Sequence, residues 1–311
     1  MVKHRLVLAM LVSTTAGIVT LAGSQAQAHD PGPAPTAAAP AAPVFLAADL
    51  RGRNEVPAAD PDGRAVAVVR IQGNQVAFAL AWRGIAAPTA SHIHLGAAGM
   101  NGAVKVAFFG GALPANVNAV TGSVTVADQT VIDAIVANPA GYYANIHTSE
   151  FPGGAVRGQL RMLKDPVDLQ RFVTMGSLVS VMSGDQEVAG GDADGHGVGF
   201  VRANNGRVDF GLSWSGIAAP SAGHIHVGAV GVNGAVVVPF FAAPGGLPAS
   251  INGIAGTVTG VAPELIRAIN HNPRGYYTNL HNAEFPGGAI RGQLFRLRSD
   301  FDNDDDALSV D

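Results

Sequence analysis

The chain places two histidines one residue apart in two segments, each time just before a glycine-rich turn. The first segment is SHIHLGAAGMNGAV (Ser91–Val104) and the second is GHIHVGAVGVNGAV (Gly223–Val236). Side chains at positions i and i+2 share one face of a β-strand, whereas on a helix they point apart. On a strand, therefore, each histidine pair presents two imidazoles to the same side, which suits two ligands of one metal ion.

A third histidine is available in each copy, in the segment YYANIH and its counterpart YYTNLH. Strand alternation puts Tyr143, Asn145 and His147 on one face of this segment. If the two segments are neighbouring strands, three neutral imidazoles converge, an arrangement that suits zinc or copper. The sequence thus predicts one copper or zinc site per copy, with the ligands His92, His94 and His147, and His224, His226 and His281. The structural alternative is that these histidines only make buried hydrogen bonds.

Charged residues near these segments are candidates for supporting roles. The runs EFPGGAVRGQL and EFPGGAIRGQL place Arg157 and Arg291 where they could attract an anion or pair with Glu150 and Glu284. A solvated strand face explains the same arginines without any function. Two further carboxylates, Glu55 and Glu187, could orient a metal-binding histidine through a hydrogen bond to its other ring nitrogen.

Most of the chain consists of two tandem copies of one sequence unit. Glu187 and Trp214 follow Glu55 and Trp82 at an interval of 132 residues. A repeat of this length is a duplicated domain. The predicted organisation is a signal peptide (1–28), a Pro/Ala-rich spacer (29–43), repeat 1 (44–163), a linker (164–175), repeat 2 (176–298) and a disordered acidic tail (299–311).

The composition bounds the fold class and the partners. The chain has 40 glycines, and short apolar runs alternate with Gly, Pro and Asn, which is typical of an all-β protein. We expect each repeat to be a β-sandwich or barrel with one short helix, capped in repeat 1 by Asp128 and opened in repeat 2 by Pro263. The net charge of −4 argues against nucleic-acid binding.

The amino-terminal segment predicts export. MVKHR is followed by an apolar run and by AQA, which is the pattern of a cleaved secretory signal, and an uncleaved membrane anchor is the alternative. No later segment is apolar enough to span a bilayer, so we expect a secreted or extracytoplasmic protein without a membrane partner. The chain has no cysteine, which excludes a disulfide framework.

The segments EVP, HIHLGAAGMNG and YYANIHTSEFPGGAVRGQL, and their second copies, resemble the CHRD domain, which is named after chordin and occurs in exported microbial proteins. The resemblance implies two domains with an immunoglobulin-like fold and a distant similarity to copper/zinc superoxide dismutases. In those enzymes a His-x-His strand and a later histidine bind copper, and an arginine guides the anion. His92, His94, His147 and Arg157 occur here in the same order, but the bridging histidine, the zinc-loop ligands and the disulfide cysteines are missing.

Three functions follow as hypotheses. The first is a non-enzymatic binding protein that holds one copper or zinc ion per repeat for sequestration or an extracytoplasmic accessory role. The second is a dismutase-like copper redox enzyme. The third is a non-catalytic adhesive or structural module whose duplicated surface binds an extracellular protein or matrix partner.

Overall fold

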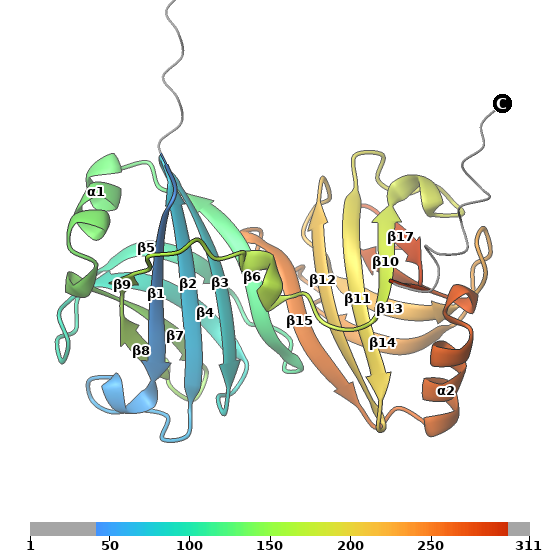
Figure 1. Ribbon diagram of the computed structural model, residues 1–311, viewed down its shortest axis with the longest axis horizontal. Helices are drawn as coiled ribbons and strands as arrows, with labels where there is room; N and C mark the ends of the chain where they lie inside the picture. Colours follow the sequence, from blue (N-terminus) through green and yellow to red (C-terminus); the bar gives the residue numbers. More distant parts are fainter. Residues whose placement is uncertain (1–41, 298–311) are drawn as a thin grey trace, which may run out of the picture. The chain divides into compact units, whose positions relative to one another are not determined.

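The computed structural model describes residues 42–297, and the predicted signal peptide, most of the spacer and the acidic tail lie outside this range. The described residues form eighteen β-strands and two α-helices, and every strand pairing is antiparallel. The prediction of an all-β fold with one short helix per repeat is therefore confirmed (Figure 1).

Repeat 1 contributes the first nine strands. In chain order they are β1 (Val44–Arg51), β2 (Arg64–Gln72), β3 (Gln75–Arg83), β4 (Pro88–Leu95), β5 (Val104–Gly110), β6 (Val117–Thr125), β7 (Tyr142–Thr148), β8 (Val156–Gln159) and β9 (Arg161–Met162). Their pairing order is β5–β4–β7–β8–β1–β2–β3–β6, and β9 also pairs with β1. The two strands that carry histidines, β4 and β7, are thus direct neighbours.

Repeat 2 follows the same plan with nine further strands. These are β10 (Leu178–Ser183), β11 (His196–Asn204), β12 (Arg207–Ser215), β13 (Ala222–Val227), β14 (Val236–Ala242), β15 (Ile251–Thr259), β16 (Tyr276–His281), β17 (Ile290–Gln293) and β18 (Phe295–Arg296). Their pairing order is β14–β13–β16–β17–β10–β11–β12–β15, with β18 beside β10. The strand β15 also pairs with β6 of repeat 1.

The helices begin where the sequence places their caps. In repeat 1, α1 spans Gln129–Ala137, and the Asp128 side chain accepts a hydrogen bond from the Thr130 amide at 2.9 Å. This bond satisfies one of the amides that the first turn leaves without a partner. In repeat 2, α2 spans Pro263–His271 and opens with proline, which needs no amide partner.

The predicted linker is ordered along part of its length. It contains a 3₁₀ turn, η3 (Leu169–Phe172), whose preceding residue Asp168 accepts a hydrogen bond from the Gln170 amide at 3.0 Å. Val173 is buried against Ala119 and Ala255. The linker therefore packs on the sheet.

Strand alternation separates a core face from an outer face in both repeats. On β7 the core face carries Tyr142, Ala144 and Ile146, which belong to the apolar cluster. Phe78 and Phe108 stack within that cluster at 4.7 Å between ring centroids. The alternate residues of β7 point to the opposite face, as the period of two requires. The histidines lie on this outer face, where loops cover them.

Candidate metal centre

The strands β4 and β7 bring the three predicted histidines of repeat 1 together. In their register His94 is opposite Tyr143, His92 is opposite Asn145 and Ala90 is opposite His147. Partners in this register point to the same face, so the three imidazoles share one side of the sheet. One ring nitrogen from each of them lies within 4.8 Å of the other two.

Repeat 2 reproduces this cluster on β13 and β16. His224, His226 and His281 again offer ring nitrogens that lie within 4.8 Å of one another. His224 Nδ1 is 3.0 Å from His281 Nε2, and the corresponding separation between His92 and His147 is 3.1 Å. The duplication has therefore preserved the geometry of the cluster as well as its residue types.

Backbone carbonyls set the tautomers of two histidines in each cluster. His94 Nδ1 donates to the Gly102 carbonyl at 2.9 Å, and His147 Nδ1 donates to the Pro152 carbonyl at 2.9 Å. Because a carbonyl oxygen only accepts, each Nδ1 carries the proton and each neutral ring keeps a lone pair on Nε2. In repeat 2 the same donations reach Gly234 at 2.8 Å and Pro286 at 3.0 Å.

The Nε2 atom of His94 takes no part in the hydrogen bonds of the cluster. It is buried and has no hydrogen-bond partner, and the same holds for His226 Nε2. A buried nitrogen whose lone pair accepts no hydrogen bond is unfavourable unless something binds it. Two ligands of a tetrahedral zinc ion are separated by about 3.3 Å, close to the 3.1 Å between His92 Nδ1 and His147 Nε2. The residues therefore fit a metal ion bound through one nitrogen of each histidine.

Burial favours the neutral form of two imidazoles in each cluster. Burial, together with the weaker effect of charge repulsion from the nearby His147 and His94, lowers the pKa of His92 to about 4. Burial also lowers the pKa of His147, although its bond to the Pro152 carbonyl acts in the opposite direction. His224 follows the same pattern, with a pKa of about 4. Neutral imidazole is the form that binds metals, so protons do not compete strongly for the site near pH 7.

Tyr143 lies between the histidines and the buried arginine. Its ring stacks on His94 with centroids 4.9 Å apart and planes inclined by 8°. The guanidinium carbon of Arg157 lies 3.9 Å from the same ring centroid. Two groups centred this closely on one ring occupy opposite faces, so the tyrosine separates the arginine from His94. In repeat 2, Tyr277 stacks on His226 and Arg291 lies 3.5 Å from its centroid.

The guanidinium of Arg157 holds the loop that covers the site. The residue is 1% exposed, and it donates to Asn101 Oδ1 and to the Met100 carbonyl, both at 2.9 Å. Arg291 makes the corresponding bonds to Asn233 and Val232. The loop held in this way continues to Gly102, whose carbonyl binds His94. The predicted role of guiding an anion needs donors that face solvent, and these donors face the loop.

The four predicted carboxylates divide into two buried and two exposed. Glu55 is 7% exposed, and burial raises its pKa to about 7 while the charge of Arg157 acts to lower it. Glu187 is also buried, its pKa is raised for the same reason, and it bonds to Asn279. Glu150 and Glu284, in contrast, are exposed.

Residue types alone do not reveal the groups that orient the histidines. They are the carbonyls of Gly102 and Pro152, together with the ring of Tyr143. The turns Asn101-Gly102 and Pro152-Gly153-Gly154 recur in both copies, and this recurrence is the only sign in the sequence that these turns contribute to the site. Side-chain types do not reveal a backbone carbonyl as a partner, so only the folded chain shows these contacts.

Fold and site together define an all-β protein with a duplicated three-histidine cluster. The family model of the CHRD domain matches the chain twice, at residues 46–160 and 178–294, and the chain therefore belongs to the CHRD domain family. Comparisons with curated proteins and with solved structures returned no match. The similarity to copper/zinc superoxide dismutases thus remains a prediction from the sequence. Among the described residues, no helix is long and apolar enough to cross a membrane.

Proposed function

We propose that this protein binds one copper or zinc ion in each repeat, through His92, His94 and His147 in repeat 1 and their three counterparts in repeat 2. The observation that carries the proposal is the buried, unpartnered Nε2 of His94, which faces two further imidazole nitrogens. The duplicated cluster repeats this feature at His226. Three neutral nitrogen donors suit zinc and copper and do not suit magnesium or calcium, which prefer oxygen ligands.

The role that we propose is metal sequestration or an accessory function outside the cytoplasm. The amino-terminal signal supports export, and the CHRD family assignment supports a binding module. The bound ion would supply Lewis acidity and, in the case of copper, redox chemistry. The chain's own contribution is to orient His94 and His147 through the carbonyls of Gly102 and Pro152.

The experiment is a metal titration of chelator-treated protein with Zn²⁺ and with Cu²⁺, read out by calorimetry and by elemental analysis after desalting. We expect two ions per chain for the wild type, one for His94→Ala and none for His94→Ala combined with His226→Ala. His196→Ala and His271→Ala are matched controls, because both histidines lie outside the clusters, and they should leave two ions bound.

Thermal unfolding supplies a second readout. A ligand that binds only the native state stabilises it by about 2.7 kcal/mol when its concentration is a hundred times its Kd. We expect both ions to raise the melting temperature of the wild type and a chelator to reverse this change. An equal metal stoichiometry in the wild type and the double alanine variant would refute the proposal. An unchanged melting temperature would favour the adhesive or structural function instead.

A further inference from the structure

Three arginines form a row across neighbouring strands on the outer face of repeat 1. Arg51 on β1 is opposite Arg64 on β2, and Arg64 is opposite Arg83 on β3. Adjacent strands are about 4.8 Å apart, and partners in register point to the same face. Arg83 is exposed, and the other two are half-buried.

This row is electrostatically unfavourable as long as nothing binds to it. Like charges directly opposite each other on neighbouring strands destabilise a sheet. Asp49 compensates one charge through an ion pair with Arg51 at 2.7 Å. Arg64 donates to the Gly63 carbonyl at 2.8 Å, which leaves its charge uncompensated. Asp62 comes near Gly84, but in the described residues neither it nor any other carboxylate forms an ion pair with Arg64 or Arg83.

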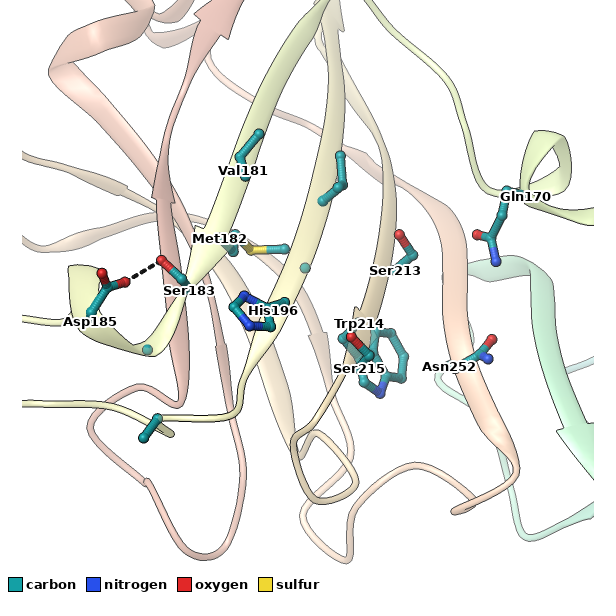
Figure 2. Close-up of a pocket in the computed structure, with 14 residues that line it drawn as sticks. Gln170, Val181, Met182, Ser183, Asp185, His196, Ser213, Trp214, Ser215 and Asn252 are labelled. Atoms are coloured by element: carbon teal, nitrogen blue, oxygen red, sulfur yellow. Dashed lines mark hydrogen bonds between the residues drawn. The ribbon is translucent and has the colours of Figure 1, made fainter. Parts of the chain in front are cut away.

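Repeat 2 shows that the fold does not require arginine at these positions. The corresponding residues are Ser183, His196 and Ser215, in the same register on β10, β11 and β12. Figure 2 shows these three side chains among those that line an open pocket of about 780 Å³, where Ser183 bonds to Asp185. Because the duplicated unit keeps its strands with two hydroxyls and one imidazole, packing alone does not explain the arginine row.

The arginines surround a smaller cavity in repeat 1. Its volume is about 240 Å³, and its lining includes the three arginines, Asp49 and the apolar side chain of Val66, whereas the Trp82 side chain packs in the core. Three positive charges and one negative charge leave a local excess of two positive charges, in a chain whose net charge is −4. The guanidinium fork matches the oxygens of phosphate and sulfate, because two parallel N–H groups reach two oxygens at once.

We propose that this cavity binds a phosphate or sulfate group between Arg64, Arg83 and the Asp49-paired Arg51, either as the free ion or on a larger ligand. The proposal is independent of the metal centre. Arg51 is in register with Arg157 on β8, but Arg157 is buried beneath the loop that it holds. The anion cavity and the histidine cluster therefore lie on one face of the sheet but have different linings.

The experiment uses the full chain after chelator treatment, so that an anion cannot bind through a metal ion. Inorganic phosphate, inorganic sulfate and a sulfated disaccharide are titrated separately by calorimetry at low ionic strength. We expect saturable binding of one anion per chain by the wild type. The variant Arg64→His with Arg83→Ser, which installs the residues of repeat 2, should bind at least tenfold more weakly.

Arg70→Gln is the matched control. Arg70 lies on the outer face of the same strand, six residues from Arg64, and bonds to Gln72, so its removal changes the net charge without changing the row. It should keep the wild-type affinity within twofold. Arg83→Ser alone serves as the second variant if the double variant unfolds, which thermal unfolding without anion will show.

Each outcome of these titrations either supports or overturns the anion site. Weaker binding in the row variants alone supports the site, and tighter binding of the disaccharide than of sulfate identifies the group as one carried on a glycan. Equal affinities identify the free oxyanion. Absence of saturable binding by the wild type, or an equal loss in Arg70→Gln and the row variants, overturns the proposal, because diffuse charge would then explain the data.

Discussion

Replacing Arg157 by lysine tests whether this arginine positions the metal site from a distance. Arg157 Nη1 and Nη2 reach Asn101 Oδ1 and the Met100 carbonyl, both at 2.9 Å. Lysine keeps the charge, but its single ammonium lacks the planar fork that spans the two acceptors. At least one charge-assisted hydrogen bond is lost, which costs about 1.5–3 kcal/mol of unfolding free energy.

The loop transmits the loss of this hydrogen bond to His94. Residues 97–101 continue into Gly102, whose carbonyl accepts from His94 Nδ1 at 2.9 Å. A looser loop weakens the bond that orients this ligand, and changes to such supporting partners reduce metal affinity by about 10–100-fold. We therefore expect Arg157→Lys to weaken metal binding in repeat 1 by about that factor and to leave repeat 2 unchanged.

Zinc titration with a competing chelator measures this effect, because it resolves two affinities in one chain. Arg291→Lys is the mirror experiment and should weaken only the site of repeat 2, since Arg291 makes the corresponding bonds there. Denaturation of the metal-free protein measures the accompanying loss of stability. If both lysine variants fold and keep two wild-type affinities, the positioning role of the arginine is wrong.

Three further predictions follow from the same geometry. Because the pKa of His92 is lowered to about 4, protonation of this ligand should weaken metal binding as the pH falls towards 4, measured by the same titration at each pH. The pKa of Glu55 is raised from 4.5 to about 7, so between these pH values the native state binds more protons than the unfolded state. The free energy of unfolding should therefore fall by up to about 3 kcal/mol as the pH rises from 4.5 to above 7. Urea denaturation at pH 5 and pH 8 should show that Glu55→Gln removes most of this fall, and an unchanged pH dependence would contradict the assigned pKa. Gly154 has a φ of +135°, and an added Cβ would meet Glu55 Oε1 at 2.5 Å. Gly154→Ala should therefore destabilise the protein by about 2 kcal/mol or more in the same assay. Gly153→Ala is the control and should change stability much less, because a Cβ at Gly153 would enter open space.

Local patterns predicted the fold class because they report on one strand or one helix at a time. The alternation in YYANIH separated the core residue Ile146 from His147 and Asn145, and the structure places them on opposite faces. Asp128 and Pro263 marked the helix starts because caps act within one turn. The grouping of three histidines followed from the same period of two, once β4 and β7 were assumed to be neighbours.

The partners of those histidines depend on contacts between distant segments. The side chain of Arg157 suggested an anion guide, yet it bonds to a loop 56 and 57 positions earlier in the chain. From the sequence, Glu150 is a candidate partner of Arg157 and Glu55 is a candidate for orienting a histidine, and neither residue type indicates burial. Folding buries Glu55 and leaves Glu150 exposed, since η1 (Gly52–Asn54) and the residues after it pack over β8.

The all-β class, the duplication and the six histidines can be inferred from the order of residue types, because strand alternation and repetition are local properties of the chain. The orientation of the imidazoles, the position of the arginine behind Tyr143 and the row of three arginines on β1, β2 and β3 become visible only in the folded protein. A register between strands and a backbone carbonyl near a ring nitrogen arise from pairing across the fold, which no local pattern specifies.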